Sequence, residues 1–133
     1  MPFLNCQLGG ANLAFPDVCK TPSPAGPVPI PYPNNSMPCT GVPFCFKMLV
    51  TGGPAHNMLT TAPMSAGDNS GVAMGVASSM VMGPTRHLRG STAVLIQGAP
   101  ATRLLDTTGH NGATPNAVGA TLVPAQVKVC ILR

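Results

Sequence analysis

The sequence contains no glutamate and no tryptophan, and charged residues make up only 8% of its 133 positions. Its acidic side chains are three aspartates, Asp17, Asp68 and Asp106. An average soluble domain carries about 25% charged residues. We therefore expect a protein partner to cover much of this surface, although a compact neutral surface rich in Gly, Ser and Thr is the alternative.

The missing features also argue against nucleic-acid binding and membrane insertion. The seven Lys and Arg residues are mostly scattered, and only Arg86 and Arg89, with His87 between them, form a cluster. One tyrosine and no tryptophan leave no platform on which bases could stack. No apolar run reaches the ~18 residues of a membrane span, and residues 1–10 lack the basic and apolar regions of a secretory signal.

The five cysteines cannot all form disulfides within one chain, because five is an odd number. This count suits a protein made in a reducing cytoplasm, where thiols stay free. Each thiol is then expected to be either a core residue or a metal ligand.

Proline and glycine, at 16 and 15 residues, make a long helix hard to place and favour an all-β fold with little or no helix. Nine of the prolines lie within 16–43, which we interpret as an extended strap over a single domain of residues 1–133. Short strand-like runs follow, each bounded by glycine or proline. These runs cover residues 44–50, 72–82, 91–97 and 122–132.

Residues 49–61 and 95–107 form an internal repeat at a spacing of 46 positions. Six of the thirteen aligned residues are identical, and no gap is needed. Each copy predicts a strand, a Gly-X-Pro turn and a second short strand, which indicates stacked pseudo-symmetric units. His56 in the first copy aligns with Thr102 in the second.

The second copy resembles the signature of the PAAR family. The stretch 90–106 begins Gly-Ser, continues with a strand, and contains Pro-Ala-Thr-Arg at 100–103 before Asp106. Gln97 and Leu105 depart from the family's usual Asn and Gly. Residues 15–22 (Phe-Pro-Asp-Val-Cys-Lys-Thr-Pro) and 29–34 resemble the PAAR-like subfamily first catalogued as a domain of unknown function.

The resemblance implies a small tapering β-prism, or cone, with pseudo-threefold symmetry. It implies a structural, non-enzymatic protein whose broad base caps the trimeric spike of a contractile injection machine. Such tips sharpen the spike, aid transient puncture of the target membrane and carry effectors in some systems. Type VI secretion systems, extracellular injection systems and phage tails use similar tips, and the sequence leaves open which machine applies.

The resemblance also implies a metal ion bound by histidine and cysteine near the point. His56, His87 and His110 all lie at predicted turns or strand ends, and Cys19 belongs to the N-terminal motif. These four are the predicted ligands of a structural zinc ion, with iron as second choice. The other thiols stay open as alternatives: Cys6, Cys39, Cys45 and Cys130. Of these, Cys130 is most simply a core residue of the last strand, and Cys39 and Cys45 are most simply apolar filler.

Two other functions compete with the spike tip. A hydrolase would need a Cys–His–Asp set, for example Cys19 with His56 or His87 and one of the three aspartates. A structural or adaptor protein of another assembly would share the all-β fold without the metal or the spike.

Overall fold

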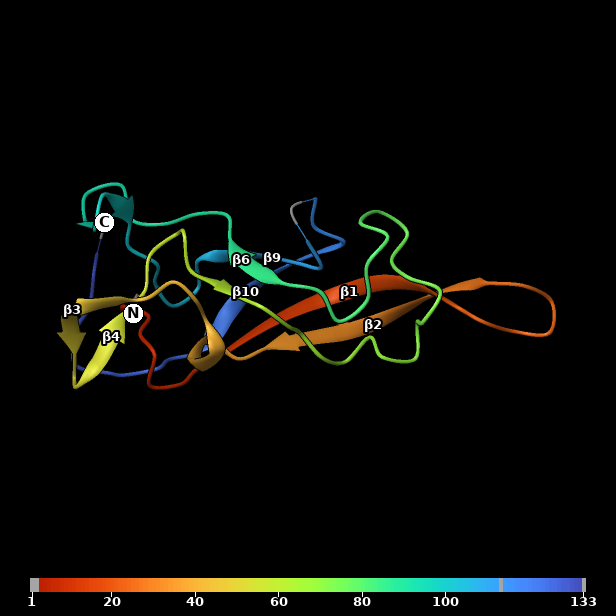
Figure 1. The fold of residues 1–133 in the computed structure, drawn as a ribbon, viewed down its shortest axis with the longest axis horizontal. Coiled ribbons are helices and arrows are strands. Elements are labelled where there is room, and N and C mark those ends of the chain that lie inside the picture. The colour runs from red at the N-terminus through yellow and green to blue at the C-terminus, as the bar shows by residue number, and fades with distance from the viewer. Residues whose placement is uncertain (1–2, 113, 133) are drawn as a thin grey trace.

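The longest strands come from the proline-rich first third of the chain. In the computed structural model, which describes residues 3–112 and 114–132, β1 (Ala11–Thr21) pairs antiparallel with β2 (Val28–Ser36). The register runs from Asn12↔Ser36 to Thr21↔Val28, with an irregularity between Ala14 and Asp17. This hairpin extends along the long axis, and its loop at residues 22–27 forms the narrow end (Figure 1).

The prolines of β2 occupy every second position, and the sheet explains why they are tolerated. Asn35 directs its N–H away from β1, to the carbonyl of Ala66 at 2.7 Å. Pro29, Pro31 and Pro33 share this outward parity, so the missing N–H groups cost no bond to β1. Strand β2 is accordingly the first strand in the sheet order.

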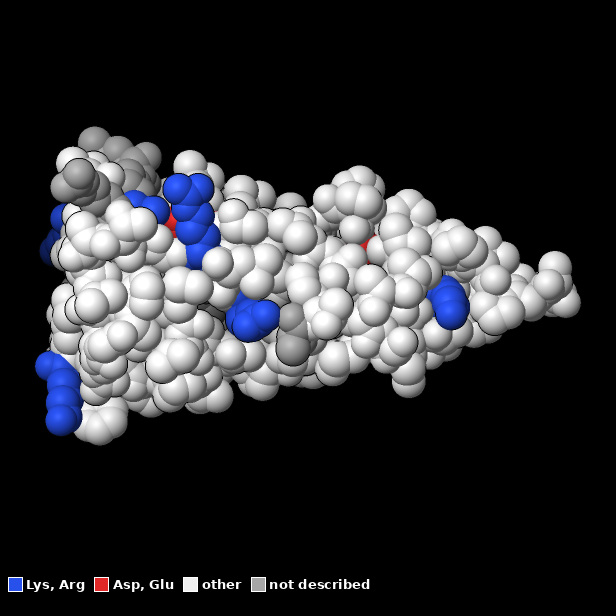
Figure 2. Space-filling model, turned by 90° about the horizontal axis from the view of Figure 1, so that it is seen from above, with Lys and Arg blue, Asp and Glu red and all other residues white. Residues whose placement is uncertain are grey.

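Six strands form one sheet in the order β2-β1-β10-β9-β6-β5. The four added strands are β5 (Thr61–Ala62), β6 (Thr85–His87), β9 (Thr107–His110) and β10 (Ala117–Val123). Isolated bridges Asn35↔Ala66 and Val42↔Thr61 connect the two edges, so the sheet is nearly closed. The only described helical segment is the short 3₁₀ turn Pro38–Thr40. The prediction of a small tapering all-β cone is confirmed (Figure 2).

Two hairpins of identical register lie at the broad end (Figure 1). Strand β3 (Cys45–Val50) pairs with β4 (Gly53–Ala55), and β7 (Leu95–Ile96) pairs with β8 (Ala99–Pro100). The matched pairs are Leu49↔Pro54 and Val50↔Gly53 in one, Leu95↔Pro100 and Ile96↔Ala99 in the other. Both turns place a polar residue and a glycine at positive φ, as two-residue hairpin turns require.

The apolar core is small and belongs to the broad end. Its buried members are Leu4, Cys6, Cys45, Val50, Ala55, Ile96, Ala101 and Ile131. The interior elsewhere is polar, with buried Asn, Asp, His, Ser and Thr side chains along the cone. Hydrogen bonds between buried polar side chains therefore stabilise the narrower part of the cone, where a wider domain would have an apolar core.

Three predicted strands are wrong in detail. Of residues 91–97 only Leu95–Ile96 is a strand, because residues 91–94 form the turn that precedes it. Residues 72–82 form turns, because Met74, Ser79 and Met82 adopt positive φ, which a strand excludes. The segment still lies along β1, since Lys20 N–H donates to Met74 O at 2.8 Å. The last predicted strand, 122–132, overlaps β10 only at its start, because Pro124 follows the end of that strand. No described segment is a helix long and apolar enough to cross a membrane.

Candidate metal centre

Asp17, Cys19 and Asp68 form a compact buried group in the interior of the cone. One ligand atom from each lies within 4.8 Å of the other two, and all three residues are 0% exposed. Asp17 and Cys19 are two positions apart on β1, so both side chains leave the same face of the strand. Asp68 comes from the turn after β5. This group could hold a metal ion.

Neutral donors surround the two carboxylates. Asn111 Nδ2 donates to Asp17 Oδ2 at 2.6 Å and to Asp68 Oδ2 at 2.7 Å. Asn34 Nδ2 donates to Asp17 Oδ2 at 2.5 Å, and Asn116 Nδ2 donates to Asp17 Oδ1. Among the described residues, neither carboxylate forms an ion pair with Lys or Arg. The group is therefore held by hydrogen bonds that do not neutralise its charge.

The thiol of Cys19 points at both carboxylates. Its Sγ lies 3.5 Å from Asp17 Oδ1 and 3.6 Å from Asp68 Oδ2. Burial, and then the two neighbouring carboxylates, raise the pKa of this thiol to about 12. Without a cation the thiol stays protonated at neutral pH, which is the opposite of what an activated cysteine nucleophile needs.

The three histidines are buried at strand ends but do not join this group. His56 follows β4, while His87 and His110 end β6 and β9. Burial lowers the pKa of each to about 4. For His87, Asp106 opposes that shift, and His56 and His110 add to it. Across residues 3–112 and 114–132, no set of three or more ligand atoms within 4.8 Å includes a histidine.

Each histidine has a polar partner instead. His56 Nε2 lies 2.5 Å from Gln7 Oε1, and His110 Nε2 lies 3.2 Å from Thr108 Oγ1. His56 and His87 also line a cavity of about 10 Å³, the size of one water molecule. Of the four predicted ligands, the structure thus brings only Cys19 into a candidate metal group, and ligation by the three histidines stays a prediction.

The remaining cysteines divide between core and surface. Cys6 and Cys45 are buried in the apolar core at the broad end. Cys39 and Cys130 are exposed. The interpretation of Cys130 as a core residue is wrong, because the chain after Pro124 is not a strand with one buried face. None of the four lies in a described candidate metal group.

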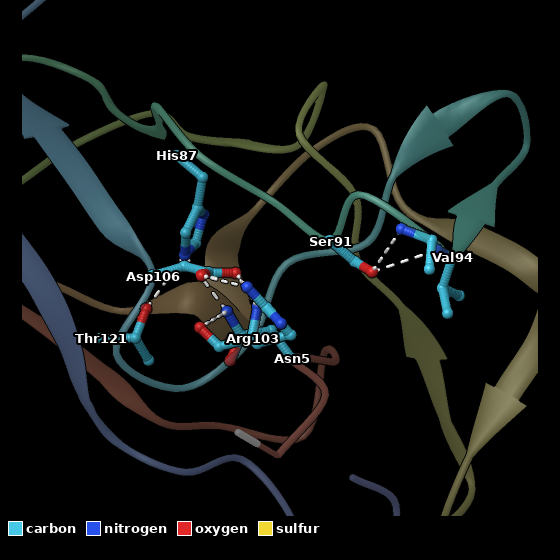
Figure 3. Close-up of polar contacts among 8 residues, drawn as sticks. Asn5, His87, Ser91, Val94, Arg103, Asp106 and Thr121 are labelled. Atoms are coloured by element: carbon cyan, nitrogen blue, oxygen red, sulfur yellow. Dashed lines mark hydrogen bonds and ion pairs between the residues drawn. The ribbon is translucent and has the colours of Figure 1, made fainter. Parts of the chain in front are cut away.

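Residues of the 90–106 motif form a second polar cluster (Figure 3). Its hydrogen bonds hold the local backbone in place. Arg103 holds Asp106 through two side-chain contacts, Nη2 to Oδ1 at 3.0 Å and Nε to Oδ2 at 3.2 Å. The Arg103 N–H donates to the same carboxylate at 2.9 Å. Ser91 Oγ accepts from the Val94 N–H at 3.0 Å and so fixes the turn before β7.

His87 adjoins this cluster (Figure 3). Its Nε2 lies 3.0 Å from Thr121 Oγ1 on β10 and 3.1 Å from Asn5 Nδ2. His87 thereby links β6 to β10 and to Asn5 near the N-terminus.

Asp17 and Asp68 belong to the candidate metal group, and the sequence analysis did not predict them as metal ligands. A usable signal was present, because the chain has only three acidic residues and one of them stands two positions before Cys19 on an extended segment. No sequence pattern indicates Asp68 as a member of the group, because Asp68 lies 49 residues after Cys19 and reaches it only through the fold.

A family model described as the toxin PAAR-like domain matches residues 10–119 of the chain. The match includes the Asp17, Cys19 and Asp68 group and the motif cluster at 90–106. No curated protein and no solved structure matches the chain.

Proposed function

Because the chain belongs to the toxin PAAR-like domain family, we propose that it is the structural tip of a contractile injection machine. Its broad end caps a trimeric spike protein, and its narrow end leads during puncture of a target membrane. It is made in the bacterial cytoplasm and leaves with the particle, together with any effector attached to it. It binds no nucleic acid.

The observation that carries this proposal is the apolar surface of the broad end. The two register-matched hairpins expose large apolar side chains: Phe46 is 69%, Leu49 62% and Leu95 63% exposed. Large apolar side chains exposed on both hairpins of one end suit a protein–protein contact there. Repeated hairpins also suit a single chain that meets a threefold partner, since each repeat can contact an equivalent part of the trimer.

The tapered shape and sparse charge support the same function. Figure 2 shows a mostly uncharged surface that narrows steadily to one end. The loop at that end, residues 22–27, contains no charged residue. A narrow neutral point has little charge to desolvate when it enters an apolar bilayer.

We propose no catalytic role. Cys19 contacts two carboxylates instead of a histidine, and its raised pKa disfavours the thiolate that a nucleophilic mechanism requires. Rapid alkylation of Cys19 in the metal-loaded protein would contradict this, because an accessible reactive thiol is what an enzyme would need.

We also propose a structural metal, zinc first and iron second, as part of the folded tip. Cys19 lies in the buried group that could hold it. His56, His87 and His110 stay proposed as the alternative set of nitrogen donors for this one ion. A metal at either set would stabilise a cone whose apolar core is confined to one end.

The test is binding to a trimeric spike protein encoded in the same gene cluster. Light scattering after size-exclusion chromatography should give one copy of this chain per trimer. The double variant Leu49→Lys/Leu95→Lys should weaken binding at least tenfold, because both hairpins lose apolar contact and would bury a charge.

The control is Val118→Lys, which adds one of these two charges at a 56% exposed apolar residue of β10, away from the hairpins. It should bind like the wild type. Equal binding by the double variant, or a stoichiometry other than one chain per trimer, would contradict the proposed function.

A further inference from the structure

We propose that Asp17, Cys19 and Asp68 together bind one divalent transition-metal cation, best matched by Zn²⁺. The inference rests on the structural metal proposed above, not on the spike. It names a donor set of two carboxylates and a thiolate, which differs from the histidine-rich set expected from the sequence.

The first argument is charge. Two carboxylates at 0% exposure cost several kcal/mol each to remove from water unless a positive charge compensates them. In the part of the chain that the structure describes, neither has a Lys or Arg partner. The amides of Asn111 and Asn34 orient the two carboxylates but carry no charge. A divalent cation would balance both carboxylates at once.

The second argument is distance. With Zn–S near ~2.3 Å and Zn–O near ~2.0 Å, a tetrahedral ion separates a thiolate sulfur from a carboxylate oxygen by about 3.5 Å. The two separations in this group are 3.5 Å and 3.6 Å. A single S–H proton can satisfy only one of these contacts well, whereas one metal ion accounts for both.

The third argument is Asn34, a residue at 0% exposure whose side-chain oxygen has no hydrogen-bond partner. Its amide is directed into the group, since Nδ2 lies 2.5 Å from Asp17 Oδ2. A buried acceptor without a donor is costly, and next to this group it offers an oxygen donor to a cation. This unsatisfied oxygen is an observation separate from the carboxylates, and a cation bound beside Asn34 would account for it.

The donor chemistry selects the kind of ion. Mg²⁺ and Ca²⁺ favour sites made of oxygen alone, so the sulfur of Cys19 argues against them. Zinc accepts carboxylate oxygen together with thiolate sulfur. Cys19 would bind as the thiolate, with its proton released to solvent on binding.

The test begins with the full chain loaded with Zn²⁺, desalted, and analysed for metal by mass spectrometry. Wild type should retain about one ion per chain. Asp68→Asn and Cys19→Ser should each lower retention at least tenfold. Their matched controls, Asp106→Asn and Cys45→Ser, change a buried aspartate and a buried thiol outside the group and should retain the ion. His56→Gln should also retain it.

A second readout holds even if a variant fails to fold. The wild-type chain loaded with Co²⁺ should show a thiolate-to-metal charge-transfer band, and Cys19 should resist alkylation until a chelator is added. A wild type that retains no Zn²⁺, a Co²⁺ form without that band, or loss of metal in His56→Gln with retention in Asp68→Asn overturns the proposal. Spike binding is measured separately, so its failure would leave this result intact.

Discussion

The three buried histidines are the residues through which acid should first affect this protein. Each has a pKa lowered to about 4 from the ordinary 6.5, because burial disfavours the charged ring. Between these two values the unfolded chain binds more protons than the folded one. The free energy of unfolding of the metal-free protein should therefore be constant above pH 7 and fall progressively from about pH 6.5 to pH 4.

Urea titrations at several pH values, in the presence of a chelator, measure this directly. The slope should approach about 1.4 kcal/mol per pH unit for each contributing histidine midway between the two pKa values, near about pH 5. His110→Gln should reduce the slope, because one proton acceptor of the unfolded state is removed. A free energy that stays level from pH 7 to pH 5 would contradict the prediction.

The sequence indicates which residues could bind a metal better than it indicates which of them lie together in the fold. Its place in a motif predicts Cys19 as a ligand, and Cys19 does lie in the candidate metal group. The positions of the three histidines at turns predict convergence, but convergence depends on which turns the fold brings together. Asp68 reaches Cys19 only because its turn packs against β1, and no local pattern in the sequence encodes that approach.

At the scale of the element, Gly119 decides how closely β10 and β1 can pair. It lies opposite Ala14, and a Cβ added there would stand 2.0 Å from the backbone oxygen of Leu13. The backbone cannot yield as a side chain can, so Gly119→Ala should destabilise the protein by on the order of 3 kcal/mol. Thermal or urea unfolding measures the loss.

The control for this variant is the neighbouring substitution Val118→Ala, at an exposed side chain of the same strand. It should change stability by about 0.5 kcal/mol or less. If Gly119→Ala is as stable as this control, β1 and β10 are not packed as closely as described here.

Strands were predictable where sequence alternation and turn residues agreed. The hairpin β3–β4 follows from a glycine-containing turn after an apolar run, and the repeat predicted its counterpart β7–β8. The turn itself is Thr51–Gly52, one residue before the predicted Gly-Gly-Pro, because Gly53 and Pro54 already belong to β4. The Met- and Gly-rich stretch 72–82 was not predictable in this way. Its small and flexible residues also permit positive φ, and packing against β1 selects turns over a strand.

At the scale of the whole molecule, the apolar base should control solubility. With a net charge of +4 and few charged residues, the isolated chain has little electrostatic repulsion to oppose association through that base. We expect sedimentation velocity to show self-association that increases with concentration. Adding the spike protein should abolish it by covering the same surface.

The Leu49→Lys/Leu95→Lys variant should remain monomeric at concentrations where wild type associates. Val118→Lys adds charge away from the base and should reduce self-association less. The comparison separates an effect of the base from an effect of net charge. A wild-type chain that is monomeric and highly soluble without any partner would show that the apolar base does not drive self-association.

The β1–β2 hairpin also has a mechanical consequence. Both strands run along the long axis, and the loop that joins them is the point of the cone (Figure 1). A compressive force on the loop is carried by both strands at the same time. The antiparallel ladder between them, from Thr21↔Val28 back to Asn12↔Ser36, joins the two strands along their length and so opposes the buckling of either one. The stiffness of the point thus comes from strand direction, in a region too thin to contain an apolar core.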